Sequence, residues 1–484
     1  MMKRYIIGLD AGTTSVRTVI YDVVNSEIVL LKRAPITSSY PHKGWVEQDA
    51  EEIFFNLKKT LESAIEEMNV PLGDYIGAGL TNQRETSVAF DSKTGKPYYK
   101  AIVWQCRRTN DYIENLPQEI ITIIKQKTGL IPDAYFSASK FKWLKDNVKK
   151  VNEAELKSRL YFGTLDAYLA FMFTGNFVTD VTNASRTMLF NISELNWDNE
   201  LLKFFGIKKE TLPKVISNAE EVGCLLNTKI PLLSMIGDQQ SSLVGNGAFD
   251  AGMAKMTYGT GGFVLLNTGN NIIRSNKILS TVAYSVGGKT YYALEGSIFS
   301  ACSALDWAKK ELSLTEDYDL LDQKMLKLKS NNGIYFVPAF TGLGCPYWKP
   351  NAQGIITGLT FDTDKYMIMR ACYESIAYNT KAIFDEMTKT HKIKIQGIRA
   401  DGGGSKSRFL TSFQAGLLGV PVLTGKTSEA TVLGCIYLAG VAAKVFDFDK
   451  LNALTKPVNV FAPNLSSEEI NKLYAGWEKA IKNV

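Results

Sequence analysis

Near the start of the chain, the apolar residues 5–9 run directly into a carboxylate, a glycine and three hydroxyl residues, Asp10-Ala11-Gly12-Thr13-Thr14-Ser15. Backbone N–H groups and hydroxyls in such a turn can surround phosphate oxygens, and a carboxylate at the end of a strand can hold a magnesium ion. The same residues also fit an ordinary hairpin turn. The segment therefore predicts a nucleotide site only if a second feature of the chain supports it.

A second turn of the same kind supplies that support. Thr257-Tyr258-Gly259-Thr260-Gly261-Gly262-Phe263 lies about 245 residues further on and leads into the apolar residues 264–266. Two Gly/Thr hairpins, each at the head of a β-rich half, resemble the layout of the actin-like ATPases, in which paired phosphate turns hold one nucleotide between two lobes. The resemblance implies an α/β protein with a two-domain actin-like (ribonuclease H-like) ATPase fold and an interdomain active-site cleft.

The length of the chain agrees with two domains. Its 484 residues exceed what one hydrophobic core usually supports. Strand-like stretches such as 28–31 alternate with amphipathic helical ones such as 50–68, which favours mixed α/β layers. A glycine-rich segment at 245–252 marks the boundary. We therefore expect an N-terminal domain over 1–248, a C-terminal domain over 249–484, and a hinge between them.

Composition argues against several classes of partner. The chain carries 55 Lys and Arg against 49 Asp and Glu, with no basic tract, which indicates mild attraction for anionic ligands and no nucleic-acid footprint. Its six cysteines lack metal-ligand spacing and fit reduced thiols. No run approaches the roughly 18 apolar residues of a membrane span. We expect a cytoplasmic enzyme that binds neither nucleic acid nor a membrane.

Two neighbouring segments, 79–86 and 101–109, suggest a pocket for a small polyol. In the first, Arg84 and Glu85 follow an apolar strand and can donate to and accept from adjacent hydroxyls. In the second, the indole of Trp104 offers a wall for a carbon backbone. An Arg next to a Glu is by itself more often a surface ion pair, so the interpretation depends on the rest of the chain.

The rest of the chain resembles the glycerol-kinase branch of the FGGY carbohydrate kinase family, from about residue 4 to about residue 480. The resemblance is carried by residues 44–49, 81–86, 135–143, 179–191, 237–240, 335–348 and 434–440. It implies ATP-dependent phosphorylation of glycerol to glycerol 3-phosphate, with ATP and Mg²⁺ as cofactors. It also implies a homodimer or homotetramer, because the family commonly forms both.

The resemblance assigns catalytic roles to three residues. Asp238 is expected to accept the proton of the attacking hydroxyl, Asp10 to hold magnesium with Asp238 beside it, and Arg17 to clamp the transferring phosphoryl group. In phosphoryl transfer the protein mainly positions groups and neutralises charge, so one carboxylate at the nucleophile and one at the metal suffice. From the residues alone, Asp238 also fits a helix N-cap.

The resemblance further assigns the two substrates to separate sets of residues. Glycerol is expected to contact Arg84, Glu85, Trp104, Tyr135, Asp238, Gln239 and Phe263, although Phe263 also fits an ordinary core position. The nucleotide is expected to contact Thr13, Thr14, Ser15, Gly259, Thr260, Cys302, Asp306, Gly403 and Ser407.

Three of the nucleotide residues depart from the family's usual pattern. Cys302 stands where glycine is usual, Asp306 where glutamine is usual, and Ser407 where asparagine is usual. A carboxylate can accept from an adenine amino group but cannot donate as glutamine does, so the departures place the base preference in question.

Two other functions stay open at this point. The three departures and the Gly-Gly-Gly-Ser turn at 402–405 favour an FGGY kinase for another small polyol or ketose, such as a tetritol or a pentulose. The two phosphate turns alone are shared with actin-like filament and chaperone ATPases. Such ATPases have no reason to carry Arg84, Trp104 and Tyr135 together.

Two lysine-bearing turns elsewhere resemble the end of a P-loop. They lie at 287–290 and 425–427, and both lack the upstream glycine of that motif, because Ala283 and Val420 stand there. We assign no nucleotide phosphate to either turn.

Overall fold

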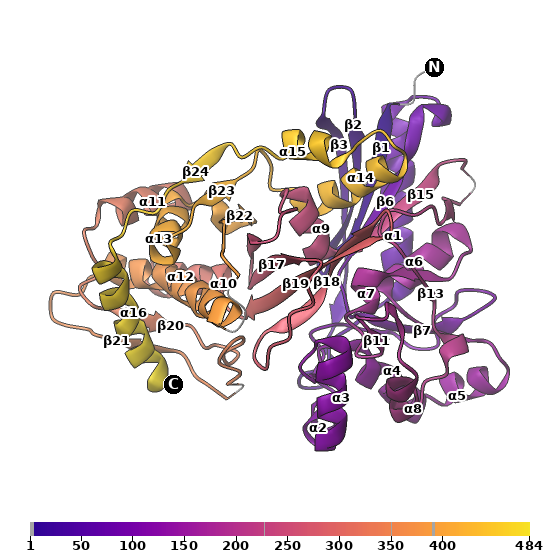
Figure 1. The fold of residues 1–484 in the computed structure, drawn as a ribbon, viewed down its shortest axis with the longest axis horizontal. Helices are drawn as coiled ribbons and strands as arrows, with labels where there is room; N and C mark the ends of the chain where they lie inside the picture. The colour runs from indigo at the N-terminus through magenta and orange to yellow at the C-terminus, as the bar shows by residue number, and fades with distance from the viewer. Residues whose placement is uncertain (1–3, 227, 350, 390–392) are drawn as a thin grey trace.

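The computed structural model describes residues 4–226, 228–349, 351–389 and 393–484, and consists of two α/β lobes (Figure 1). The first lobe is built on a six-stranded sheet in the order β14-β15-β6-β1-β2-β3. The bounds of these strands are β14 (Gly223–Cys224), β15 (Pro231–Gly237), β6 (Tyr75–Asn82), β1 (Tyr5–Ala11), β2 (Ser15–Asp22) and β3 (Glu27–Pro35). The predicted α/β class with two domains is confirmed.

The second lobe is built on a seven-stranded sheet in the order β18-β19-β17-β16-β22-β23-β24. Its strands are β18 (Leu279–Val286), β19 (Lys289–Ile298), β17 (Gly262–Gly269), β16 (Met253–Tyr258), β22 (Gly397–Asp401), β23 (Val422–Thr424) and β24 (Asn459–Phe461). In Figure 1, β17, β18 and β19 extend from this lobe toward the first.

The two sheets repeat one topology. β1 pairs antiparallel with β2 and parallel with β6, which pairs parallel with β15. In the same way, β16 pairs antiparallel with β17 and parallel with β22, which pairs parallel with β23. The two predicted phosphate turns, β1–β2 and β16–β17, therefore occupy equivalent places in the two lobes.

Smaller sheets complete both lobes. A five-stranded sheet joins β4 (Ser38–Ser39), β5 (Glu47–Gln48), β8 (Ala101–Ile102), β7 (Ser87–Asp91) and β9 (Leu160–Thr164) in the first lobe. Two-stranded pairs are formed by β10 (Val178–Asp180) with β13 (Lys214–Ile216), β11 (Phe190–Asn191) with β12 (Asn196–Trp197), and β20 (Tyr335–Val337) with β21 (Ile355–Thr357).

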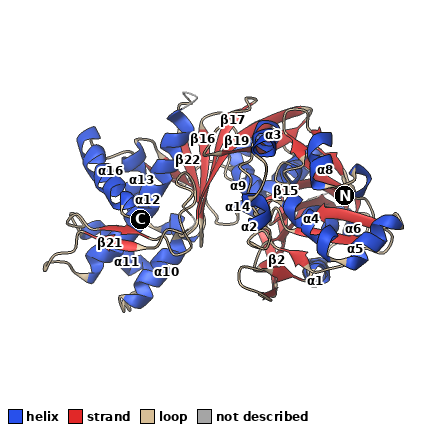
Figure 2. Cartoon of the chain, turned by 90° about the horizontal axis from the view of Figure 1, so that it is seen from below, coloured by secondary structure: helices blue, strands red, loops and turns tan. Residues whose placement is uncertain are grey.

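Helices flank the sheets (Figure 2). Those before residue 246 are α1 (Ala50–Met68), α2 (Asn110–Glu114), α3 (Gln118–Thr128), α4 (Ser137–Asn147), α5 (Lys149–Leu156), α6 (Leu165–Thr174), α7 (Val181–Ala184), α8 (Asn199–Phe205) and α9 (Asp238–Gly245). Those after it are α10 (Cys302–Glu311), α11 (Tyr318–Lys327), α12 (Lys365–Lys389), α13 (Arg408–Leu418), α14 (Ala430–Ala442), α15 (Phe448–Leu454) and α16 (Ser467–Lys482). Within the described residues, no helix is both long enough and apolar enough to cross a bilayer.

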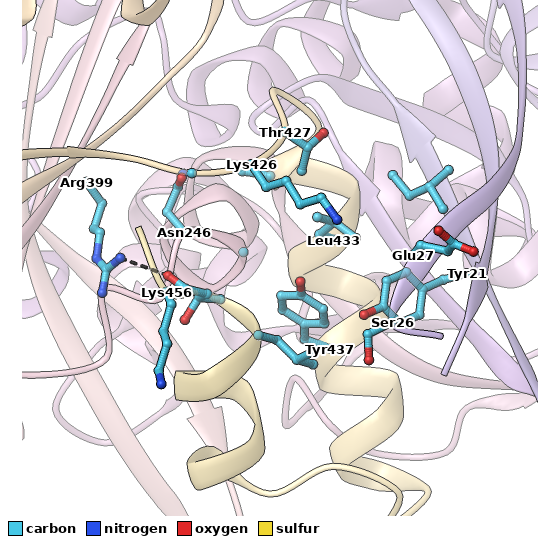
Figure 3. A pocket seen from close by; sticks show the side chains of 16 residues that line it. Tyr21, Ser26, Glu27, Asn246, Arg399, Lys426, Thr427, Leu433, Tyr437 and Lys456 are labelled. Atoms are coloured by element: carbon cyan, nitrogen blue, oxygen red, sulfur yellow. Dashed lines mark hydrogen bonds between the residues drawn. The ribbon is translucent and has the colours of Figure 1, made fainter. Parts of the chain in front are cut away.

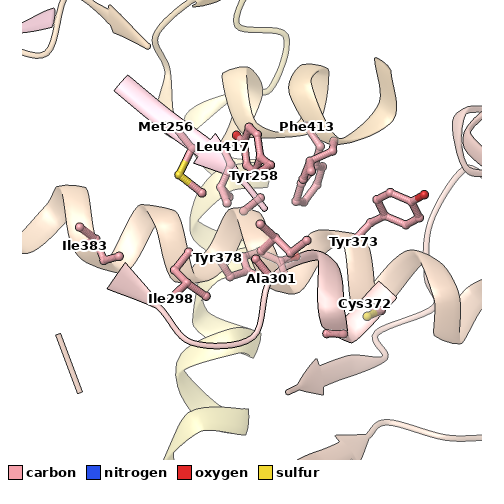
Figure 4. Close-up of a cluster of buried hydrophobic side chains, with 14 of the residues drawn as sticks. Met256, Tyr258, Ile298, Ala301, Cys372, Tyr373, Tyr378, Ile383, Phe413 and Leu417 are labelled. Carbon is pink, nitrogen blue, oxygen red and sulfur yellow. The ribbon is translucent and has the colours of Figure 1, made fainter. Parts of the chain in front are cut away.

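The core of the second lobe lies between its sheet and α12 and α13 (Figure 4). Met256 and Tyr258 of β16 and Ile298 of β19 are buried there against Tyr378 and Phe413. Burial of a large side chain stabilises a fold by about 1.5 to 3 kcal/mol. This packing fixes the strand ends that carry the second phosphate turn.

Helices α9 and α14 cross in close contact between the two sheets. A Cβ atom on Gly434 would lie far below van der Waals contact distance from Ser241 O, and one on Gly245 would lie equally close to Ala430 O. A Cβ on Gly79 of β6 would likewise meet Cys435 O. Although α14 comes from the C-terminal half of the chain, it packs on the first lobe.

The chain passes between the lobes at three successive places. Residues 246–252 lead from α9 to β16, residues 425–429 lead from β23 to α14, and residues 455–458 lead from α15 to β24. The predicted boundary at 248/249 falls in the first of these. The division of the whole chain at that single point stays a prediction, because the 430–454 segment packs in one cluster with Ile6 and Tyr21 of the first lobe.

Gly434→Ala tests the α9–α14 crossing. The added methyl group has to displace the backbone at Ser241. Removing the intrinsic cost of glycine in a helix stabilises by at most about 1 kcal/mol, whereas overpacking destabilises by about 1 to 3 kcal/mol, and rigid backbone leaves little room for relief. Urea unfolding should therefore show a clear loss of stability. Gly73→Ala is the control, since no atom lies within 4 Å of the place that its methyl group would take. Equal stability of both variants would contradict the close crossing.

Candidate active site

The first phosphate turn is held by side chains from the surrounding loops. The N–H of Gly12 donates to Ser15 O at 3.1 Å, which closes the β1–β2 turn. Trp104 Nε1 donates to Thr13 Oγ1 at 3.0 Å, and Gln48 Nε2 donates to Thr13 O at 2.7 Å. Thr14 is exposed and Ser15 is buried. The structure thus joins Trp104, predicted as a polyol wall, directly to the predicted nucleotide turn.

Asp10 lies at the end of β1, and only 4% of it is exposed. Among the described residues, no hydrogen-bond donor reaches its carboxylate. Its nearest counter-charge is Arg17 Nε at 3.8 Å, and Arg17 also pairs through Nη1 with Glu429 Oε2 at 2.8 Å. Burial raises the pKa of Asp10 to about 7, which Arg17 partly opposes and Asp238 increases. A second cation near this carboxylate would therefore be stabilising.

Arg84 follows β6 and is buried among polar groups. Its Nη1 and Nη2 donate to the two carboxylate oxygens of Glu295 at 2.7 and 2.8 Å. Glu295 lies on β19, so a fork-like ion pair joins the two halves of the chain. Its pKa is lowered to about 2, because the charges of Arg186 and Arg84 outweigh its burial. Arg84 Nε lies 3.3 Å from Asp238 Oδ1.

Glu85 has a backbone φ of 60°, a left-handed conformation that is unusual for a non-glycine residue. Its side chain accepts from Arg186 Nε at 2.6 Å, and its main-chain oxygen accepts from Ser137 Oγ at 3.1 Å. Burial raises the pKa of Glu85, while Arg84 and Arg186 oppose that shift. Arg84, Glu85, Arg186 and Glu295 therefore form one buried ion network with alternating charges.

Asp238 is the first residue of α9, and a quarter of its side chain is exposed. Burial raises its pKa, and Arg84 and Lys255 partly oppose the rise. The neighbouring Gln239 accepts through Oε1 from Lys255 Nζ at 2.6 Å. Lys255 is fully buried on β16, and burial lowers its pKa to about 8. The carboxylate is thus accessible, and the amide beside it is held in one orientation.

Two aromatic rings stand beside this cluster. Trp104 and Tyr135 have ring centroids 5.7 Å apart at 70°, and Arg84 Nη2 lies 3.5 Å from Tyr135 Oη. Phe263 lies on β17, opposite Thr257 and Ser297, and it is half-buried without a ring contact in the described part of the chain. The structure therefore brings Trp104 and Tyr135 to the charged cluster, whereas the ring of Phe263 contacts neither of them.

The second phosphate turn contacts the start of α10. Ala301 N donates to Thr260 O and Cys302 N donates to Gly259 O, each at 3.0 Å. Cys302 Sγ donates to Tyr258 O at 3.5 Å, and a Cβ on Gly404 would lie 2.8 Å from the sulfur. Gly259, Thr260, Cys302 and the turn at 402–404 thus form one group. Gly403 itself is exposed.

The other two departures from the family pattern already have partners within the protein. Asp306 accepts a hydrogen bond from the hydroxyl of Tyr318, and both residues line a surface cavity of about 400 Å³. Ser407 caps α13 by accepting from Leu410 N at 3.0 Å, and it donates to Asp322. Each side chain would have to share these bonds in order to contact a nucleotide base.

Among the buried charged residues that the sequence did not identify, four lie at or next to this site: Arg186, Lys255, Glu295 and Asp401. Asp401, at the end of β22, accepts from Ser242 at 2.6 Å, Asn246 at 2.8 Å and Thr257 at 2.5 Å, and so joins α9 to β16. Lys255 and Glu295 each interrupt a run of apolar strand residues. Since buried charges are rare unless paired, that interruption was the signal available in the sequence.

The donor set at Asp10 fits a magnesium ion. The carboxylate is buried, lacks a hydrogen-bond donor among the described residues, and keeps a raised pKa despite Arg17. In the described part of the chain, no three His, Cys, Asp or Glu residues group as metal ligands. Mg²⁺ commonly binds through one or two carboxylates together with substrate phosphates, so it does not need such a group.

Comparison with known proteins identifies the family. Residues 5–256 match the N-terminal domain of the FGGY family of carbohydrate kinases, and residues 254–443 match its C-terminal domain. A glycerol kinase of Thermococcus gammatolerans is 44% identical over 99% of this chain and 98% of its own length.

Solved structures agree with that match. The Plasmodium falciparum glycerol kinase with ADP has a TM-score of 0.93 and 33% identity, covering 99% of this chain and 98% of that one. A Lactobacillus acidophilus xylulose kinase has a TM-score of 0.88 at 24% identity, covering 99% and 98%, and it supports the fold alone. The chain belongs to the FGGY family of carbohydrate kinases.

Glu295→Gln tests the buried ion network. The substitution keeps the shape but removes one of the two carboxylates, Glu85 and Glu295, that Arg84 and Arg186 share, which should lower the free energy of unfolding by about 3 kcal/mol. The native carboxylate has a lowered pKa, so its contribution is complete above the ordinary pKa of glutamate and is lost as the pH falls toward 2. The difference between the two proteins should therefore shrink below about pH 4.5.

The matched control is Glu316→Gln, which breaks an ion pair with the more exposed Lys324. That loss should be clearly smaller than the loss in Glu295→Gln, because solvent screens the pair. Chemical denaturation at several pH values gives both quantities. A Glu295→Gln variant as stable as this control would contradict the network's structural role.

Proposed function

We propose that this chain transfers the terminal phosphoryl group of ATP to glycerol and releases glycerol 3-phosphate and ADP. The observation that carries the proposal is the cluster of Arg84, Glu85, Tyr135, Asp238 and Gln239 beside the Asp10 turn. It offers fixed donors and acceptors for several hydroxyls next to a phosphate turn. The relatives named glycerol kinase, which match the chain from end to end, support the same activity.

Asp238 acts as the general base. Its carboxylate is partly exposed and adjoins Arg84, so it can accept the proton of a terminal hydroxyl while that oxygen attacks the γ-phosphorus of ATP. The new P–O bond forms as the bond to the ADP oxygen breaks, and the proton stays on the protein until product release. The raised pKa of Asp238 suits a group that takes up a proton near neutral pH.

Gln239 is placed to donate a hydrogen bond to a hydroxyl oxygen of the polyol. Lys255 occupies its carbonyl oxygen, so its amino group, which lies beside the Asp238 carboxylate, is the donor that Gln239 has left for a ligand. Arg84 donates and Glu85 accepts at the same site, and each donor or acceptor left unpaired by a wrong ligand costs about 1 to 3 kcal/mol. The pocket therefore favours a compact molecule with hydroxyls on neighbouring carbons.

The remaining groups neutralise charge. Arg17, beside Asp10, is placed to interact with the transferring phosphoryl group. Asp10, with Asp238 close by, would hold Mg²⁺, which supplies positive charge to the phosphate oxygens when bound. Thr13, Thr14 and Ser15 on one lobe, and Gly259 and Thr260 on the other, would contact the phosphates. Cys302 and Gly403 would lie toward the base.

The departures at Cys302, Asp306 and Ser407 bear on the nucleotide more than on the polyol. They lie around α10 and the start of α13, and none of them bonds to a residue of the Arg84 cluster. They therefore favour a change in base preference over a tetritol or pentulose substrate. We further infer a cytoplasmic enzyme that forms a homodimer or homotetramer, a state that light scattering would measure.

Product identification tests the proposal. The protein, with Mg²⁺ and ATP, is offered glycerol, erythritol, threitol, xylulose or ribulose, and the phosphorylated products are identified. Glycerol should be preferred, and Asp238→Asn should lower its turnover by about 10²- to 10⁴-fold. Asp319→Asn, an exposed aspartate on α11, is the control. Preference for a longer substrate, or full turnover in Asp238→Asn, would contradict the proposal.

Lys255→Met should separate activity from stability. The variant removes a buried charge, so the free energy of unfolding should stay equal or rise, whereas Gln239 loses its fixed orientation. Loss of one oriented hydrogen bond should raise the KM for glycerol by roughly 10- to 100-fold. Because Lys255 lowers the pKa of Asp238, the acid limb of the kcat/KM profile should also move to higher pH.

Steady-state kinetics over a pH series, with Lys289→Met as the control for removal of an exposed lysine, would check this prediction. An unchanged KM together with an unchanged acid limb would show that Lys255 does not act on Gln239 or Asp238.

A further inference from the structure

A cavity of about 290 Å³ lies where the chain crosses between the lobes (Figure 3). The three crossing segments all contribute to its wall, through Asn246, through Gly425 to Thr427, and through Thr455 and Lys456. The β2–β3 hairpin of the first lobe closes one side, and Leu433 and Tyr437 of α14 line the middle. None of the residues assigned above to the polyol or the nucleotide lines it.

The charge of the wall favours an anion. Arg399, Lys426 and Lys456 line the cavity, and none of them forms an ion pair within the described residues. The only acidic residue in the lining is Glu27. Arg399 donates from Nη1 to Thr455 O at 2.8 Å, while its Nε has no acceptor in the described part of the chain. Three cations against one carboxylate leave a net charge of two positive units, which matches a phosphate group at neutral pH.

A neighbouring cavity adds to the positive charge around this one. Gly425, Lys426 and Thr427 also line a neighbouring cavity of about 660 Å³, whose wall adds Lys406 and Arg408. Neither added cation has an ion-pair partner among the described residues. Clefts lined by one sign of charge concentrate counter-ions locally. Lys426 therefore stands between two basic cavities.

The volume of the cavity and the polar groups in its wall restrict the class of ligand further. A volume of 290 Å³ corresponds to roughly ten waters at about 30 Å³ each, which is more than a phosphate group fills. Ser26 and Thr427 offer hydroxyls, and Tyr21 and Tyr437 offer ring surface. A phosphate group on a short organic chain would contact the cations through the phosphate and the two tyrosine rings through the chain.

We propose that this cavity binds a small organic phosphate and that the bound ligand slows turnover by holding the lobes in the arrangement seen here. The second part follows from the location of the cavity. A rotation of one lobe on the other has to move the crossing segments, and with them the cationic and hairpin walls. A ligand that bridges these walls favours the arrangement in which they are close.

A binding measurement tests the site without relying on catalysis. Glycerol 2-phosphate, inorganic phosphate and succinate are each titrated calorimetrically into the protein, with a non-hydrolysable ATP analogue and glycerol present to fill the sites assigned above. We expect one saturable site per chain for glycerol 2-phosphate, weaker binding of inorganic phosphate, and no binding of succinate. No saturable binding of either phosphate, or equally tight binding of succinate, would overturn the proposal.

Variants locate the site. Lys426→Gln/Lys456→Gln should weaken the binding of glycerol 2-phosphate at least tenfold, while Lys149→Gln/Lys150→Gln, which removes two exposed charges on α5, should leave it unchanged. Equal binding by both double variants would place the ligand elsewhere and contradict the proposal.

A kinetic measurement tests whether ligand binding in the cavity is coupled to the lobes, and this test rests on the proposed function. Saturating glycerol 2-phosphate should lower the kcat of the wild type about threefold or more, and should not change that of Lys426→Gln/Lys456→Gln. Binding without any effect on turnover would contradict the coupling. Absence of turnover before any effector is added would instead count against the kinase activity, so the two failures are distinguishable.

Discussion

The ion pair between Arg84 and Glu295 connects the parts of the molecule on which the rest of the site depends. Both side chains are about 1% exposed, and they lie 211 residues apart in the sequence, Arg84 just after β6 and Glu295 on β19. A buried charge without its partner is strongly destabilising, so the pair holds Glu295 of β19 beside the residues that follow β6. Glu85, Asp238 and Tyr135 then take their places around the Arg84 guanidinium.

The repeated topology explains why the two substrates can meet. Each lobe places a Gly/Thr turn after the first strand of its sheet and a helix after its last parallel strand, and these two helices, α9 and α14, pack on one another. Asp238 begins α9, and Asp401 joins β22 to the same helix. The general base Asp238 is therefore linked mechanically to the two phosphate turns and to the crossing segments. Both the chemistry and the basic cavity depend on this linkage.

Much of the fold and part of the site could be predicted from the sequence, for identifiable physical reasons. Each Gly/Thr turn alone also fits an ordinary hairpin, and it was the pair of turns, one in each half of the chain, that predicted a nucleotide site. Arg84 and Trp104 were suggested by their segments, but their roles were assigned only through the resemblance to the family. Glu295 and Lys255 were missed because their partners lie far away in the sequence, and a single charge inside an apolar strand does not say what it pairs with.

The residues expected near the nucleotide base show what the sequence could not predict. Resemblance to the family placed Asp306 and Ser407 toward the nucleotide, but it could not show that Tyr318 and Asp322 already bond to them. Nor could it show that the segment 430–454 returns to pack on the first lobe. Both features depend on tertiary contacts that no local pattern encodes.

The central claim is that the Arg84 cluster holds the polyol with one terminal hydroxyl on Asp238. The most direct measurement is a crystal structure with glycerol and a non-hydrolysable ATP analogue bound. We predict one terminal oxygen of glycerol within about 3.2 Å of the Asp238 carboxylate, with the other oxygens bonded to Arg84, Glu85 and Gln239. Glycerol bound away from Arg84, or with no oxygen near Asp238, would contradict the account.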